Sequence, residues 1–122
     1  MIKLLYCIRR LPALDVRTFR RELPPWTDAA RRLAKATGAT DLTVHTALAV
    51  KANELLMSAR GTAEPFDLVL EMTYGVPGPE AMAALQRPEA QAVLADMSRV
   101  AERLFDFAGS SLFFTSSEET PA

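Results

Sequence analysis

Four apolar runs of strand length constrain the fold more than any other feature of this 122-residue sequence. They occupy residues 2–8, 41–48, 66–74 and 110–116. Along each run the alternate residues fall into two sets of different character, as expected where successive side chains of a strand point to opposite faces of a sheet. The sequence therefore predicts four strands whose two faces meet different surroundings.

The two predicted faces differ in polarity. One set is almost wholly apolar and suits a face covered by helices; it consists of Ile2, Leu4, Tyr6, Ile8, Leu42, Val44, Leu48, Phe66, Leu68, Leu70, Met72, Leu112 and Phe114. The opposite set is mixed; it consists of Leu5, Cys7, Arg9, Thr43, His45, Asp67, Val69, Glu71, Thr73 and Phe113. The mixed face is too apolar to stay in water, so we expect a second copy to cover it and form a barrel-like homodimer with a pocket in each half.

Helical periodicity separates the first two strands and the last two. Residues 16–23 and 26–38 have helical spacing, and Pro24 and Pro25 interrupt them because proline lacks the backbone N–H of a continuous helix. Residues 79–104 are rich in Ala, Leu, Gln and Glu, with a second helix expected to start at Pro88. Residues 51–61 suit a short helical turn or loop.

This order of elements predicts an α+β protein with the ferredoxin-like split βαβ arrangement, a four-stranded antiparallel sheet with helices on one face. The chain length suits one domain. We place that domain at residues 1–116 and a polar C-terminal tail at residues 117–122.

Composition excludes several classes of partner. The 14 basic and 15 acidic residues leave a net charge of −1, which disfavours nucleic acid and anionic membranes. No apolar run approaches the roughly 18 residues of a membrane span. A single cysteine cannot form an internal disulfide, and no export signal is apparent, so we expect a cytoplasmic protein.

Several segments resemble the EthD-domain family, named for an accessory protein of bacterial alkyl ether degradation. They are "LLYCIRRLPALDVRTF", "NELLMSARG", "EPFDLVLEM", "LQRPEAQ" and "RLFDFAGSSLFFTSSEE", and together they span nearly the whole chain in the family's order. The resemblance implies a dimeric α+β barrel. This architecture is shared with small cofactor-free oxygenases, lactone isomerases, polyketide-modifying enzymes and some haem-handling proteins, so it implies no single reaction.

The family's first helix typically carries a histidine that points toward the pocket, four residues after a Tyr-Trp pair. No alignment places a histidine there in this chain. Anchoring on Trp26 puts Ala30 at that position, and the only histidine is His45, on a predicted strand. The resemblance therefore implies that the bend at Pro24 and Pro25 shapes the pocket but does not supply its base.

Three residues of the mixed face are candidate catalytic groups. His45 could exchange a proton near neutral pH, and burial would poise Glu71 as a general acid or base. The guanidinium of Arg9 could hold an oxyanion. The alternatives are a hydrogen-bonded histidine at the dimer interface and an ion pair between Glu71 and Arg9.

Other residues are candidates for lining an apolar pocket; they are Trp26, Cys7, Leu5, Val69 and Phe113. Cys7 is more typical of a small buried hydrophobe than of a nucleophile, because no base or orienting group is evident beside it. One histidine and one cysteine on different strands do not make a metal site, so we expect no metal and no bound cofactor.

Two functions remain open at this point. The first is an enzyme of small hydrophobic or aromatic molecules, a cofactor-free oxygenase, cyclase/dehydratase or isomerase in which Glu71 or His45 moves a proton and Arg9 steadies an oxyanion. The second is a non-catalytic ligand-binding or accessory protein of a degradation pathway. Haem handling through His45 is a weaker third alternative.

Overall fold

The computed structural model describes residues 1–118. The elements in this part of the chain are β1 (Ile2–Arg10), α1 (Val16–Glu22), α2 (Pro24–Thr37), β2 (Asp41–Thr46), α3 (Lys51–Arg60), β3 (Leu68–Tyr74), α4 (Gly78–Leu85), α5 (Pro88–Leu104) and β4 (Phe105–Ser116). The regular structure thus ends where the domain was predicted to end. Residues 119–122 of the predicted tail 117–122 lie outside the described residues, so that division of the chain stays a prediction.

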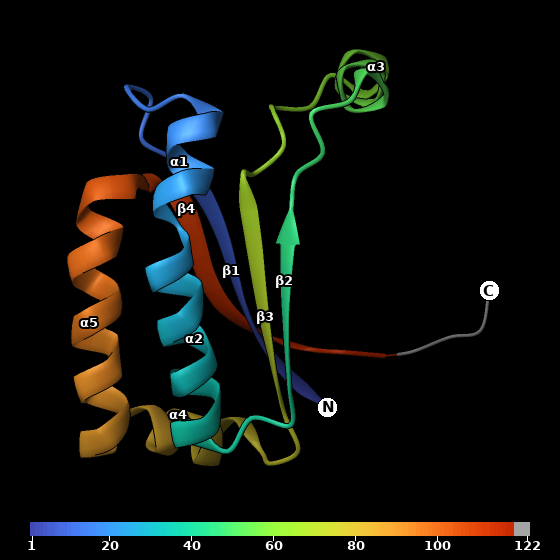
Figure 1. Ribbon diagram of the computed structural model, residues 1–122. Helices are drawn as coiled ribbons and strands as arrows, with labels where there is room; N and C mark the ends of the chain where they lie inside the picture. The colour runs from blue at the N-terminus through green and yellow to red at the C-terminus, as the bar shows by residue number, and fades with distance from the viewer. Residues whose placement is uncertain (119–122) are drawn as a thin grey trace.

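The four strands form one antiparallel sheet in the order β2-β3-β1-β4. Figure 1 shows α1, α2, α4 and α5 on one side of this sheet, whereas α3 stands beyond one end of the sheet and on its other side. The predicted α+β architecture, a four-stranded antiparallel sheet with helices on one face, is confirmed. The helix α3 is an addition to the basic pattern of six elements.

The strand register shows which residues share a face. Leu4 pairs with Met72 and Phe114, and Tyr6 pairs with Leu70 and Leu112, on the side of the helices. Leu5, between them, pairs with Glu71 and Phe113 on the other side, which we call the open face. The predicted division of the strands into an apolar and a mixed face therefore holds within the paired segments.

Two residues assigned to the apolar face from the sequence lie elsewhere. Leu48 follows the end of β2 and is exposed, because β2 stops at Thr46 and not at residue 48. Phe66 precedes the start of β3 at Leu68, and the Arg9 guanidinium lies over its ring. The prediction that Leu48 and Phe66 lie on the apolar face was wrong, because the alternation of faces was extended beyond the residues that pair in the sheet.

The two prolines separate α1 from α2, although the backbone between the two helices stays helical. Leu23, the residue between α1 and α2, keeps right-handed helical angles, and Pro24 and Pro25 occupy the first two positions of α2. Because neither proline has an N–H, the first bonds of α2 come from Trp26 and Thr27, whose N–H groups both donate to the Leu23 carbonyl. Leu23 and Trp26 are buried, so the break points apolar side chains at the sheet.

Strand β4 begins five residues earlier than predicted, at Phe105, and contains a large bulge. Cys7 pairs with Ser111 and Arg9 pairs with Asp106, so residues 107–110 lie opposite the single residue Ile8. The N–H of Gly109 donates to the Asp106 carboxylate, and a Cβ on Gly109 would lie 2.8 Å from the other carboxylate oxygen. Glycine thus permits the close approach that the bulge requires.

Candidate functional site

His45 and Glu71 form a hydrogen bond between two side chains of the open face. His45 Nε2 lies 3.0 Å from Glu71 Oε2, although the two residues are diagonal in the register, Glu71 pairing with Thr43 and His45 with Val69. The His45 side chain is 53% exposed and that of Glu71 is 27% exposed. An imidazole beside a carboxylate at this distance could relay a proton.

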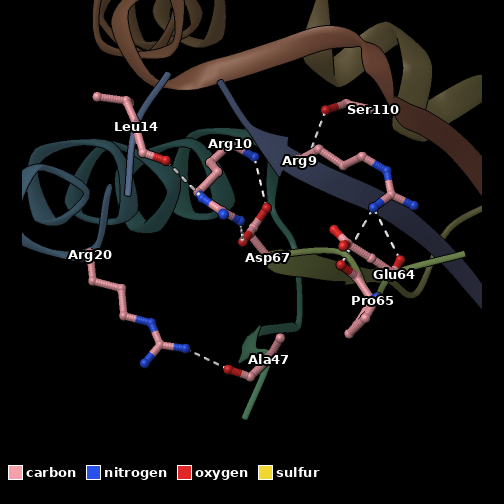
Figure 2. Close-up of polar contacts among 9 residues, drawn as sticks. All are labelled: Arg9, Arg10, Leu14, Arg20, Ala47, Glu64, Pro65, Asp67 and Ser110. Carbon is pink, nitrogen blue, oxygen red and sulfur yellow. Dashed lines mark hydrogen bonds and ion pairs between the residues drawn. The ribbon is translucent and has the colours of Figure 1, made fainter. Parts of the chain in front are cut away.

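Arg9 does not form the ion pair with Glu71 that the sequence analysis weighed as an alternative. Leu5 is the β1 residue that pairs with Glu71, and Arg9 is four residues further along the strand, a separation of about 13 Å at the usual rise per residue. The Arg9 guanidinium donates instead to the carbonyls of Glu64 and Pro65, as Figure 2 shows. Face alternation is correct for Arg9, but distance along the strand separates it from the pair.

The predicted pocket residues fall on two sides of the sheet. Leu5, Cys7 and Val69 lie half-buried at the centre of the open face, next to the His45–Glu71 pair. Trp26 lies on the helix side, where it is 1% exposed and makes edge-on contacts with the rings of Tyr6 and Phe105. These residues therefore cannot line one common pocket within a single chain.

An apolar cavity of about 500 Å³ lies on the helix side, between the sheet and helices α2, α4 and α5. We call it the helix-side cavity. Its lining includes the predicted Trp26. It also includes the predicted Phe113, which has open-face register but lies on β4, the edge strand that borders the cavity. The remaining lining residues are Leu4, Tyr6, Leu33, Leu70, Met72, Met82, Leu85, Gln86, Gln91, Leu94, Met97, Ser98, Ala101, Phe107, Leu112 and Phe114. Such a volume is within the range of about 300–1,000 Å³ typical of small-molecule sites.

The chemistry of this cavity is neutral. Its lining contains no Asp, Glu, His, Lys, Arg or Cys, and its polar groups are the Tyr6 hydroxyl, the Trp26 indole N–H, two glutamines and Ser98. Burial raises the pKa of the Tyr6 hydroxyl above its usual value, because the anion would be poorly hydrated there. Tyr6 thus remains a protonated hydrogen-bond donor at neutral pH, and the cavity holds no strong acid or base.

The sequence placed Tyr6 on the apolar face as a packing residue. It did not indicate that residues of α4 and α5 line the helix-side cavity. The residues that face the sheet from α4 and α5 include several alanines, and Ala101 lines the cavity directly. Short side chains at these positions leave space that leucines would fill. Small residues on the buried face of residues 79–104 are the signal that could have indicated a cavity.

A second cavity, of about 420 Å³, lies between α1 and α3 and has a mixed polar and apolar lining. The Arg10 guanidinium lies 2.7 Å from Asp67 and also donates to the Leu14 carbonyl. Arg20 of α1 donates to the Ala47 carbonyl (Figure 2). The lining carries basic and acidic side chains in equal number, so the second cavity has no excess of one charge.

Neither cavity is lined by His45. Among residues 1–118 no cluster of three or more His, Cys, Asp or Glu side chains could hold a metal ion. In the same residues, no helix combines the length and apolar character that crossing a membrane requires.

Comparison with known proteins places this fold among solved structures. An EthD family protein of Bacillus halodurans superimposes with a TM-score of 0.63 and 20% sequence identity, over 97% of this chain and 99% of that chain. A dimeric ferredoxin-like protein of Bacteroides fragilis gives a TM-score of 0.63 at 9% identity, over 95% of both chains. One of Thermobifida fusca gives 0.61 at 12% identity, over 95% of this chain and 90% of that chain.

The fold seen in the EthD protein is therefore also the fold of this chain, as the sequence resemblance implied. No protein-family model matches the sequence. No curated protein matches it either.

Proposed function

We propose that this protein binds a small, uncharged and largely apolar or aromatic molecule in the helix-side cavity. The observation that carries the proposal is the combination of a volume of about 500 Å³ with a lining that has no charged side chain. A charged ligand would lose its hydration there without gaining an ion pair, whereas an apolar ligand gains by leaving water. A single acceptor oxygen on the ligand would suit the Tyr6 hydroxyl.

The same chemistry favours a binding or accessory role of an EthD-like protein over catalysis in this cavity. Cofactor-free oxygenation, dehydration and isomerisation need a group that removes or supplies a proton. Tyr6 is the one titratable residue of the lining, and its raised pKa makes it a poor base. The EthD-domain family is expected to carry a histidine on the first helix. In this chain the corresponding segment of α2 contains Trp26 and Ala30, and both are buried.

Trp26, the only tryptophan of the chain, gives a direct test because it lines the cavity. We expect the uncharged probe N-phenyl-1-naphthylamine to bind and to quench Trp26 emission by energy transfer. Replacing Ala101 by phenylalanine should fill part of the cavity and weaken binding at least tenfold. Equal affinity of the wild type and Ala101→Phe would contradict the proposal.

A matched control uses the same substitution on the same helix. Ala95 of α5 is exposed and does not line the cavity, so Ala95→Phe should leave probe affinity within about twofold. Native mass spectrometry of the purified protein then identifies the class of any natural ligand. We expect a neutral hydrophobic molecule to co-purify with the wild type and with Ala95→Phe, but not with Ala101→Phe.

Proton transfer at His45 and Glu71 is a second candidate function, favoured by their 3.0 Å contact. The sheet separates this pair from the helix-side cavity, so its substrate would have to approach the open face. Glu71→Gln keeps a hydrogen-bonding side chain of the same size but removes the carboxylate base. If the co-purifying ligand is converted by the wild type and also by Glu71→Gln, this second candidate is wrong.

We also propose that the open face pairs with a second copy of the chain. Leu5, Cys7 and Val69 lie at its centre, and Phe113 is 42% exposed beside them. The similar proteins of Bacteroides fragilis and Thermobifida fusca are dimeric. Sedimentation equilibrium should give a dimer mass for the wild type, and Val69→Lys, which puts a charge at the centre of the face, should give a monomer.

A further inference from the structure

The helix α3 and the segments that join it to β2 and β3, residues 47–67, form an arm that stands away from the rest of the chain. None of the ten residues of α3 is buried. Figure 1 shows α3 beyond the end of β2, on the opposite side of the sheet from α2 and α5. The arm therefore extends over the side on which the open face lies.

Both ends of the arm are fastened to the body of the chain. On one side the Arg20 guanidinium donates to the Ala47 carbonyl, and on the other Arg9 donates to the carbonyls of Glu64 and Pro65 (Figure 2). Asp67 accepts both from the backbone N–H of Arg10, at 2.9 Å, and from its guanidinium. These contacts set the direction in which the arm extends.

The helix of the arm has an apolar side that its own chain does not cover. At 100° per residue, Ala52, Leu55, Leu56 and Ala59 fall within a stripe about 100° wide, which we call the arm stripe. Leu55 and Leu56 are each 61% exposed. Asn53 and Met57, on a different side of the helix, line the second cavity. The arm stripe thus points away from the body of its own chain.

Two further apolar residues of the arm are exposed. Leu48 and Val50, at the start of the arm, are 69% and 44% exposed and line the second cavity, on a different side from the arm stripe. The arm thus leaves apolar side chains in water on more than one side, and exposed apolar surface of this kind marks contact surfaces.

We infer that the arm stripe packs against a second copy of this chain, so that each subunit clasps the other at one end of the paired sheets. Stacked sheets lie about 10 Å apart. A partner sheet on the open face therefore occupies the side over which the arm extends. This holds whether the two-fold axis, which lies parallel to the sheets, runs along the strands or across them. The inference rests on the proposed dimer and adds a second contact surface to it.

Sedimentation equilibrium of variants with one added charge tests the arm. Leu55→Glu and Leu56→Glu keep a good helix former but place a carboxylate in the arm stripe. We expect each to raise the dimer dissociation constant at least tenfold. Ser58→Glu, which adds the same charge at an exposed position outside the arm stripe, should raise it less than threefold. If the two leucine variants dimerise as tightly as Ser58→Glu, the inference is wrong.

Hydrogen exchange gives a second readout that does not depend on mutating the arm. The amides of residues 51–60 should exchange at least tenfold more slowly above the dimer dissociation constant than in the Val69→Lys monomer. Equal exchange in the two would overturn the arm contact even if the open faces pair. A wild type that is monomeric at all concentrations would overturn both the dimer and the arm, while probe binding in the helix-side cavity would remain a separate result.

Discussion

The two faces of the sheet have opposite chemistry although the same four strands build them. On the helix side, the paired residues at the centre of the sheet are apolar or aromatic, and polar ones such as Thr46 and Ser116 lie at the strand ends. The cavity on this side has no charged group in its lining. The open face carries the His45–Glu71 pair next to Leu5, Cys7 and Val69. A ligand in the cavity cannot reach that pair through the sheet. Binding of an apolar molecule and proton transfer are therefore alternatives at two different sites, not steps of one reaction.

The largest expected difference between the faces concerns stability. Trp26 is buried and contacts Tyr6 and Phe105, so Trp26→Ala should lower the free energy of unfolding by about 3–5 kcal/mol. Phe113→Ala, on the open face, should cost about 1 kcal/mol, because the residue is 42% exposed, compared with 1% for Trp26. Urea unfolding in the Val69→Lys background measures both changes without a contribution from dimerisation. Equal losses would mean that the open face is part of the folding core.

The next comparison is between two carboxylates, Asp67, which pairs with Arg10 at the end of the sheet, and Asp41, which is exposed on β2. Asp67 accepts two hydrogen bonds from Arg10 and its side chain is largely buried. Asp67→Ala should lower the free energy of unfolding by about 1–3 kcal/mol, because two partly buried donors of Arg10 lose a charged acceptor. Asp41→Ala, which removes an exposed carboxylate, should change it by less than about 0.5 kcal/mol. A loss for Asp67→Ala no larger than this would show that Asp67 does not hold the arm.

The two tyrosines of the chain test whether the helix side is dry. Burial raises the pKa of both Tyr6 and Tyr74 above 10.0, and the hydrogen bond of Tyr74 with Thr37 only partly opposes the shift. The folded state thus holds these protons more tightly than the unfolded state, and stability is lost as the pH rises above about 10. We expect little tyrosinate absorbance at pH 10 in the folded protein. Half-ionised tyrosine at that pH, with the fold intact, would contradict a dry helix side.

Strand alternation was enough to predict the two faces of the sheet, but not which residues of neighbouring strands lie next to each other. The sequence placed Glu71, His45 and Arg9 on one face, and the structure agrees for all three. Only the register shows that Glu71 meets His45 and not Arg9. Register depends on pairing between distant segments, and the bulge at residues 107–110 shifts it in a way that no local pattern indicates.

The helix-side cavity was harder to predict than the fold. The mixed face indicated a pocket lined by Trp26, Cys7, Leu5, Val69 and Phe113, and that set stays a prediction. The helix-side cavity lies where helices with short side chains cross the sheet, and Trp26 and Phe113 of that set line it. A void depends on the summed volumes of side chains from several elements, which periodicity does not measure.

The smallest expected effect concerns the His45–Glu71 pair itself, and it separates a stabilising role from a chemical one. The imidazole is more than half exposed, so solvent screens the pair, and a double-mutant cycle of His45→Gln and Glu71→Gln should give a coupling free energy of about 0.2–1 kcal/mol in the Val69→Lys monomer. The proposed dimer covers the open face, so the coupling measured in the wild type through dimer dissociation should be larger, because removing one partner would leave the other buried without a hydrogen bond. A coupling that is the same in the monomer and in the dimer would mean that the pair stays in water, and that the second subunit does not cover this part of the face.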